Sequence, residues 1–241
     1  MASAWWWGAV ASSSLLLGAG LGLARRWSAR PVGLVLAFGA GALISAVAFE
    51  LAEEGVKVGG GPAVAVGLGA GALTYFGLDR LVERADPPRA EGVVAASSAG
   101  PALALGALLD GVPEQMVLGI GLTTGEGVSV GLLVAVFVSN LPEAIGSASS
   151  MRAAGRSPGF IWRLWIGVAV VCLLATVAGY ALGDLTGGAF KAGINGFAAG
   201  ALLVMLVDSM IPEATRQAGR SAGLATVLGF AVATGLSTLT G

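Results

Sequence analysis

Residues 164–183 read LWIGVAVVCLLATVAGYALG, a continuous apolar stretch without a single charged side chain. An α-helix rises 1.5 Å per residue, so about 20 apolar residues are needed to cross the hydrocarbon core of a bilayer, which is about 30 Å thick. This stretch has that length. It is predicted to form a helix that spans a membrane, and other stretches of similar length and apolarity can be interpreted in the same way.

Stretches of the same kind recur along the whole sequence. Charged residues make up 11% of the chain, against about 25% in soluble domains, and the mean hydropathy is +0.85. The segments lack the alternating polarity of β-barrel strands, and short polar connections join them. We therefore predict an all-α polytopic membrane protein, a single transmembrane domain of residues 1–241 with eight transmembrane helices. The predicted spans are about 5–23, 31–52, 60–81, 95–122, 127–150, 161–183, 190–213 and 221–240.

The composition also limits the kinds of partner. The 40 glycines suit a membrane bundle, because small residues let helices approach closely. A net charge of −1 gives no overall positive field that would favour binding of nucleic acid. No P-loop and no catalytic or cofactor-binding set is found, so an enzyme is not predicted. The lipid bilayer is the expected environment, and the oligomeric state stays open, with a homodimer as one option.

Basic residues are divided unevenly between the connections. With eight spans, one side holds only Lys57 and Lys191, whereas the other side holds every arginine. Because lysine and arginine gather in short cytoplasmic loops, the arginine-bearing side is predicted to be cytoplasmic. Both termini of this multi-pass cell-membrane protein are then extracytoplasmic, and residues 1–23, which lack a basic start, are interpreted as an uncleaved span. The arginines are Arg25, Arg26, Arg30, Arg80, Arg84, Arg89, Arg152, Arg156, Arg163, Arg216 and Arg220.

Two parts of the sequence resemble each other. Residues 38–55 read FGAGALISAVAFELAEEG, and residues 197–214 read FAAGALLVMLVDSMIPEA. These segments belong to the second and seventh predicted spans, which would cross the membrane in opposite directions. The similarity predicts inverted repeats of spans one to three and six to eight on either side of a central pair, a 3+2+3 arrangement.

The two central spans carry related polar motifs. Residues 110–115 read DGVPEQ and residues 139–144 read SNLPEA. In each motif a polar residue stands four positions before a glutamate, which places both side chains on one helix face. A proline precedes each glutamate, removes a backbone N–H and clashes with the carbonyl four residues earlier. We therefore expect two proline-broken helices whose freed carbonyls point into the bundle.

The acidic residues of these spans need stabilisation. An acidic side chain at the bilayer centre costs about 2.5–3.5 kcal/mol on insertion scales, and neither lysine nor arginine occurs between Arg89 and Arg152. Protonation or a bound cation can offset that cost. Carboxylates that face amide, hydroxyl and carbonyl oxygens are typical of divalent-cation sites. The candidate metal ligands are Asp110, Glu114, Ser139, Asn140 and Glu143.

These features favour a secondary transporter that moves a divalent cation into the cytoplasm by alternating access around the two central spans. A single glutamate of this kind is also compatible with a protonated packing residue, but two copies of the motif favour a functional site. Two other functions stay open: a membrane metal sensor or scaffold without transport, and a proton-coupled carrier of a small organic cation.

The sequence resembles the ZIP family of divalent metal transporters over nearly its whole length. That family has His-(Asn)-x-x-Pro-Glu-(Gly) motifs in its fourth and fifth spans, and its seventh span has an Ala-Gly-rich run followed by Asp and Ile-Pro-Glu-Ala, matched here by residues 197–200, Asp208 and 211–214. The resemblance implies eight spans in a 3+2+3 arrangement with outward-facing termini. It also implies that Glu114 and Glu143 are central ligands of a transported zinc-, manganese- or iron-class ion, with Asp110 and Ser139 at the first-ligand positions.

The histidines of these family motifs are replaced in this chain. Asp110 and Ser139 stand at those positions, and the sequence contains no histidine. Zinc favours imidazole and thiolate ligands, and the one cysteine, Cys172, is expected on the sixth span, away from both motifs. An all-oxygen site suits harder ions such as Mn²⁺. The sequence therefore predicts weak discrimination between zinc, manganese and iron.

Overall fold

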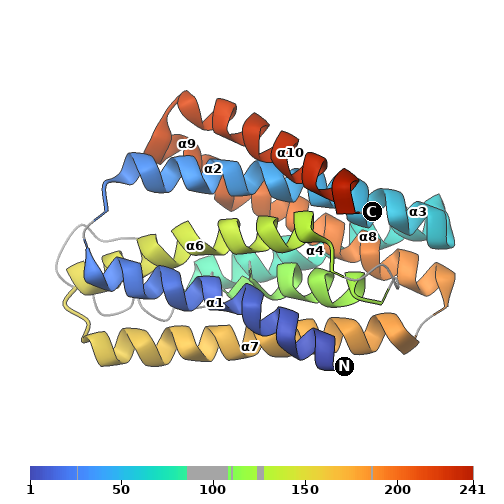
Figure 1. The fold of residues 1–241 in the computed structure, drawn as a ribbon, viewed down its shortest axis with the longest axis horizontal. Helices are drawn as coiled ribbons and strands as arrows, with labels where there is room; N and C mark the ends of the chain where they lie inside the picture. Colours follow the sequence, from blue (N-terminus) through green and yellow to red (C-terminus); the bar gives the residue numbers. More distant parts are fainter. Residues whose placement is uncertain (26, 86–107, 110, 124–127, 186, 241) are drawn as a thin grey trace.

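The computed structural model describes the chain except for residues 26, 86–107, 110, 124–127, 186 and 241, and its described regular structure is helical throughout. Seven helices of the described residues are long and apolar enough to cross a membrane. The protein is therefore an all-α polytopic membrane protein (Figure 1). The helical segments are α1 (Ala2–Ala24), α2 (Ala29–Ser45), η1 (Ala46–Glu53), α3 (Glu54–Gly59), α4 (Gly61–Ala85), α6 (Val130–Ala153), α7 (Pro158–Leu185), α8 (Gly188–Met205), η2 (Leu206–Met210), α9 (Ile211–Ala218) and α10 (Ser221–Thr240).

Half of the fourth predicted span, 95–122, falls on residues outside those described. Within it, residues 108–109 and 111–121 are helical. A Cβ atom added at Gly111 would contact Cys172, and one added at Gly179 would overlap the Met116 carbonyl. The helix over 111–121 therefore packs along α7 and runs in the same direction.

Two of the membrane-crossing helices contain a π-helical segment. Residues Ala29–Gly59 form one continuous 31-residue helix through η1, and residues Gly188–Ala218 form another through η2. Both helices end at a glycine with positive φ, Gly60 at 90° and Gly219 at 61°, a conformation that favours glycine. The two segments that resemble each other in sequence thus share one irregular helix geometry.

The expected break at the second motif proline is wrong. Pro142 lies inside α6, and the helix continues from Val130 to Ala153. Proline still removes the backbone donor that would bond the Val138 carbonyl. The missing hydrogen bond therefore does not end the helix, and the departures from α-helical geometry occur instead in η1 and η2.

Glycines hold two pairs of helices in close contact. We name the contact of α2 and η1 with α10 the first seam, and the contact of α4 with α8 and η2 the second seam. In the first seam, a Cβ at Gly41 would overlap the Thr226 carbonyl oxygen and a Cβ at Gly229 would overlap that of Phe38. Only glycine permits such an approach, which is the usual role of small residues between membrane helices.

The second seam repeats this crossing. A Cβ at Gly200 would overlap the Leu68 carbonyl oxygen, and a Cβ at Gly71 would overlap that of Phe197. Phe38 and Gly41 of the first seam are the residues that match Phe197 and Gly200 in the sequence comparison. The matching residues therefore make matching contacts.

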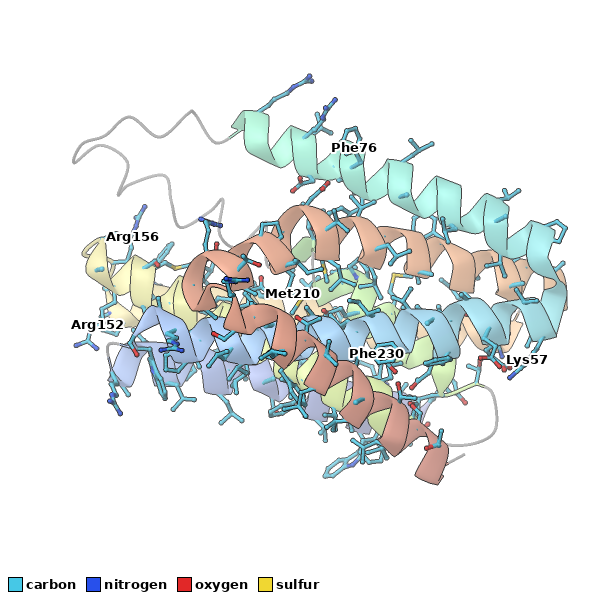
Figure 2. All side chains as sticks on the ribbon, turned by 90° about the horizontal axis from the view of Figure 1, so that it is seen from above. Lys57, Phe76, Arg152, Arg156, Met210 and Phe230 are labelled. Carbon is cyan, nitrogen blue, oxygen red and sulfur yellow. The ribbon has the colours of Figure 1, made fainter. Side chains whose placement is uncertain are left out.

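The buried apolar side chains form two clusters. One joins α2, η1, α8, η2, α9 and α10 with the first part of α6 and the helix over 111–121, and the other joins α1, α7 and the second part of α6. Both termini lie toward the end of the bundle where α3 is found (Figure 1). Figure 2 shows Lys57 at that end and Arg152 with Arg156 at the opposite end. The arginine-rich connections of α1, α6 and α9 thus share one end of the bundle.

Candidate functional site

The two motif helices pass between the two apolar clusters. Leu132 and Val136 of α6 belong to the first cluster, whereas Ala144 and Ala148 of the same helix belong to the second. Ser139 lies between these two groups along α6. The polar motif residues are therefore placed at the boundary between the clusters, near the middle of the helix.

Ser139 and Glu114 meet at this boundary. The Ser139 hydroxyl donates toward the Glu114 carboxylate, with Oγ 3.1 Å from Oε1 and 3.2 Å from Oε2. The same hydroxyl also lies 3.0 Å from the Val136 carbonyl oxygen. Glu114 and Ser139 are both 2% exposed. Because a hydroxyl has one proton, Ser139 can donate fully to only one of these acceptors at a time.

Two buried amide side chains stand next to this pair in the sequence. Asn140 is 1% exposed, and neither its Oδ1 nor its Nδ2 has a hydrogen-bond partner among the described residues. The Gln115 side-chain carbonyl accepts a hydrogen bond of 2.6 Å from Thr176, but its Nε2 has no partner in that part of the chain. Buried polar atoms are nearly always satisfied in native proteins. The side-chain atoms of Asn140 that lack a partner among the described residues are therefore candidates to bind a ligand or an ordered water.

Cys172 lies beside the first motif, so its expected separation from both motifs is wrong. A Cβ built on Gly111 would lie 2.8 Å from the Cys172 Sγ atom and 3.9 Å from the Asn140 Oδ1 atom. Cys172 is fully buried on α7. The packing of α7 along the helix over 111–121 brings it there, a tertiary contact that the spacing of the motifs does not encode.

The other side of Ser139 is covered by α2 and η2. A Cβ on Gly39 would lie 2.9 Å from the Ser139 Cα atom and 3.3 Å from the Met210 Cε atom. Gly39 thus lets α2 pass directly across the motif backbone, and Met210 reaches the same place from the π-helical segment. Sequence reasoning did not include either residue. The alternation of glycines in residues 38–41 is the one available signal for so close a crossing.

The structure brings together Glu114, Ser139 and Asn140 of the five predicted metal ligands. Glu143 lies one turn beyond Ser139 on α6 and is half-buried. Asp110 lies outside the described residues. Within the described part of the chain, no group of three or more Asp, Glu, Cys or His side chains is gathered tightly enough to hold a metal ion. A metal centre at the two motifs therefore stays a prediction.

Further polar contacts lie between this site and the α3 end of the bundle. The Ser45 and Thr234 hydroxyls are 2.8 Å apart, and Ser237 donates a 2.6 Å hydrogen bond to Glu50. Both contacts belong to the first seam. Polar side chains on α2, η1 and α10 thus meet one another from the level of Ser45 toward the α3 end of the bundle.

No model of a known protein family matches the chain. A protein of Arabidopsis thaliana named "Putative zinc transporter" is 27% identical to it over 194 residues. The match covers 78% of this chain and 31% of the Arabidopsis protein, so the chain spans about a third of that relative's length. The similarity reaches most of the helical bundle described above.

Proposed function

We propose that this protein is a secondary transporter that carries divalent metal cations of the zinc, manganese or iron class toward the cytoplasm. The observation that carries the proposal is the buried contact of Glu114 with Ser139, beside an Asn140 amide whose polar atoms have no hydrogen-bond partner among the described residues. The similarity to a relative named for zinc transport supports metal as the class of cargo.

A cation accounts for the chemistry of these residues. Glu114 is buried between apolar clusters, where an ionised carboxylate is costly. No lysine or arginine occurs between Arg89 and Arg152. A divalent ion would stabilise the carboxylate and accept the Asn140 side-chain oxygen as a hard ligand. The proposed ligands of the transported ion are Asp110, Glu114, Ser139, Asn140 and Glu143.

The Ser139 hydroxyl can respond to the ion. Without a cation it donates toward the Glu114 carboxylate. When Glu114 binds a cation, the hydroxyl can donate its proton to the Val136 carbonyl instead, which is 3.0 Å away, and offer a lone pair to the ion. The Ser139 hydroxyl then donates a hydrogen bond both with and without the cation, which suits a site that alternately holds and releases its cargo.

The choice of metal depends on the balance of oxygen and sulfur around the site. The five proposed ligands all bind through oxygen, which favours weak discrimination between zinc, manganese and iron. Cys172 adds a soft donor close to Gly111 and Asn140. Asp110→His should shift preference toward Zn²⁺ by a few-fold to a hundredfold, if the imidazole contributes about 1–3 kcal/mol of differential binding. Competition of unlabelled Zn²⁺, Mn²⁺ and Fe²⁺ against a labelled ion measures that shift.

The proposal includes eight spans in a 3+2+3 inverted repeat. The α4 helix ends near the arginine-rich end, and α6 begins beside Glu50 and Ser237, because a Cβ on Gly131 would lie 3.2 Å from the Glu50 Oε1 atom. One further crossing between α4 and α6 would account for this placement, and the described helix over 111–121 supports it. The matching glycine crossings of the two seams support the repeat, and the arginine-rich end supports termini outside the cytoplasm.

Uptake by the purified protein in liposomes tests the proposed function. We expect Zn²⁺, Mn²⁺ or Fe²⁺ to accumulate inside vesicles that contain the protein and not inside empty vesicles. A metal sensor or scaffold would bind metal without accumulation. A proton-coupled carrier of an organic cation would accumulate none of these metals, and a metal-sensitive dye inside the vesicles would stay unchanged. Either of these results would contradict the proposal.

A further inference from the structure

The two seams can be compared position by position. Their glycine crossings align Gly41 with Gly200 and Gly229 with Gly71. Continuing along each helix from these crossings aligns Ser45 of α2 with Val204 of α8, and Thr234 of α10 with Phe76 of α4. The same alignment can therefore show where the seams differ.

Beyond its glycine crossing, the first seam is closed by side-chain contacts. Ser45 and Thr234 share a hydrogen bond of 2.8 Å. The rings of Phe49 and Phe230 meet with their centroids 6.0 Å apart. These contacts fill the space between α2, η1 and α10 up to the Glu50 contact with Ser237.

The second seam is open at the corresponding positions. Asp208 and Ala72 stand where the first seam has Phe49 and Phe230, so neither aromatic ring is present to fill the space. The result is a groove of about 420 Å³ between α4 and the helix formed by α8 and η2. Its walls include Leu73, Val204 and Val207. Figure 2 shows α4 moving away from α8 toward the end of the bundle that bears Arg156.

The groove is apolar along its length and charged at one end. Asp208 lines it, is exposed, and has no hydrogen-bond or ion-pair partner among the described residues. Arg80 stacks over the Phe76 ring, which also lines the groove, with its Cζ atom 4.2 Å from the ring centroid. Gly200 packs against Ala72, so Asp208 and Arg80, each eight residues further along parallel helices, lie at a similar level.

This combination suits a zwitterionic lipid better than either an anionic lipid or an apolar protein surface. A carboxylate that faces hydrocarbon without a partner is unfavourable, and an ammonium group would offset its charge. A guanidinium binds phosphate oxygens well. The apolar walls fit a hydrocarbon chain, and the volume lies within the range of about 300–1,000 Å³ typical of ligand pockets.

We propose that the second seam binds a phospholipid with a primary ammonium headgroup. One acyl chain lies in the groove between α4 and α8, the phosphate contacts Arg80, and the ammonium group donates hydrogen bonds to Asp208. The bound lipid takes the place of the aromatic pair that closes the first seam. This site is separate from the proposed metal ligands, so it does not depend on the proposed transport function.

Retention of lipid by the purified protein tests the site. The full-length protein is reconstituted into nanodiscs of phosphatidylethanolamine, phosphatidylcholine or phosphatidylglycerol with identical acyl chains, and native mass spectrometry counts the lipids that stay bound. Val207→Trp fills the groove, and we expect it to weaken retention of phosphatidylethanolamine roughly tenfold, which corresponds to about 1.4 kcal/mol. The matched control is Val227→Trp on α10, because Val227 is 66% exposed and Val207 is 62% exposed, but Val227 does not line the groove.

Two charge variants separate the parts of the headgroup. Asp208→Asn should abolish the preference for phosphatidylethanolamine over phosphatidylcholine, because choline cannot donate a hydrogen bond. Arg80→Gln should weaken retention of both lipids. Equal retention of the three lipids by the wild-type protein would overturn the proposal. A dimer that Val207→Trp converts to monomers, with unchanged lipid retention, would instead assign the groove to a second copy of the chain.

Discussion

The centre of the bundle and its two seams use opposite means to bring helices together. At the centre, Glu114 and Ser139 meet through a buried polar contact, next to amide atoms of Asn140 that have no hydrogen-bond partner in the described part of the chain. In the seams, Gly41 and Gly71 let backbones touch with no side chain between them. Glycine contacts stabilise helix packing in lipid, whereas buried carboxylates oppose it unless they are compensated.

This difference indicates that one set of residues serves function and another serves the stability of the fold. The polar residues at the centre are not explained by packing, because apolar residues of similar size would pack there at lower cost. The glycines of the seams are explained by packing alone. Substitutions at the centre should therefore change transport and leave the fold intact. Substitutions in the seams should lower the stability of the fold without altering the proposed metal ligands.

The largest effect is expected at the centre, from Glu114→Gln. The change keeps the shape of the side chain and removes the negative charge, so metal uptake into liposomes should fall roughly hundredfold, a loss of about 2.7 kcal/mol. Size-exclusion profile and thermal midpoint should stay close to wild type. Glu53→Gln is the control, since Glu53 forms an exposed salt bridge with Lys57. Wild-type uptake by both Glu114→Gln and Glu143→Gln would show that the motif glutamates do not bind the cargo.

The second effect concerns the seams. Gly71→Val would place side-chain atoms where the Phe197 carbonyl now lies, and overpacking of this kind typically costs about 1–3 kcal/mol. We expect a lower thermal midpoint and a reduced yield of monodisperse protein. Gly69→Val on the same helix is the matched control, because a Cβ at Gly69 would meet nothing within 4 Å. Equal stability of the two variants would contradict the role given to the second seam.

A third, smaller effect is expected at the Ser139 hydroxyl. Ser139→Ala removes the hydroxyl oxygen that is proposed to bind the ion, so the KM for the cation should rise about tenfold, which corresponds to about 1.4 kcal/mol of binding free energy. Ser147→Ala on α6 is the control, since Ser147 Oγ is buried and has no partner in the described structure. Initial rates of uptake over a range of metal concentrations give the KM of Ser139→Ala and that of the control. An unchanged KM in Ser139→Ala would remove the hydroxyl from the proposed ligand set.

The smallest effect is expected at Cys172. Cys172→Ser replaces the sulfur near Gly111 with oxygen at similar size, and the preference for Zn²⁺ over Mn²⁺ should fall a few-fold, since sulfur favours zinc. Ala169→Ser on the same buried face of α7 adds a hydroxyl without removing sulfur and serves as the control. Competition of Zn²⁺ and Mn²⁺ for uptake measures the ratio. A ratio equal to wild type would leave the metal choice to the oxygen ligands alone.

The helical spans could be predicted because their length and apolarity are local properties of the chain. The π-helical segments η1 and η2 could not be predicted, because length and apolarity do not distinguish a π-helical segment from the α-helix around it. The break expected at Pro142 was wrong for a related reason. Proline removes one hydrogen bond, but the contacts of Ala144 and Ala148 with α1 continue on its far side and hold α6 in one helix.

The candidate site could be predicted only in part. The four-residue spacing located Glu114 and Ser139 on the faces that meet. The neighbours from elsewhere in the chain, Cys172 on α7 and Met210 in η2, are set by helix packing and lie far away in the sequence. A buried thiol next to the motif therefore became visible only in three dimensions, and it altered the expected chemistry of the site.

The seams also constrain how the chain is made. The glycine face of α2 is covered by α10, which is made after every other described helix, and that of α4 is covered by α8. Neither early helix can complete its packing while the second half of the chain is still being synthesised. Assembly of the bundle therefore has to wait for contacts between residues far apart in the sequence, which are slow to form. A ribosome that stops before α10 would release a chain whose α2 still presents its bare glycine face to lipid.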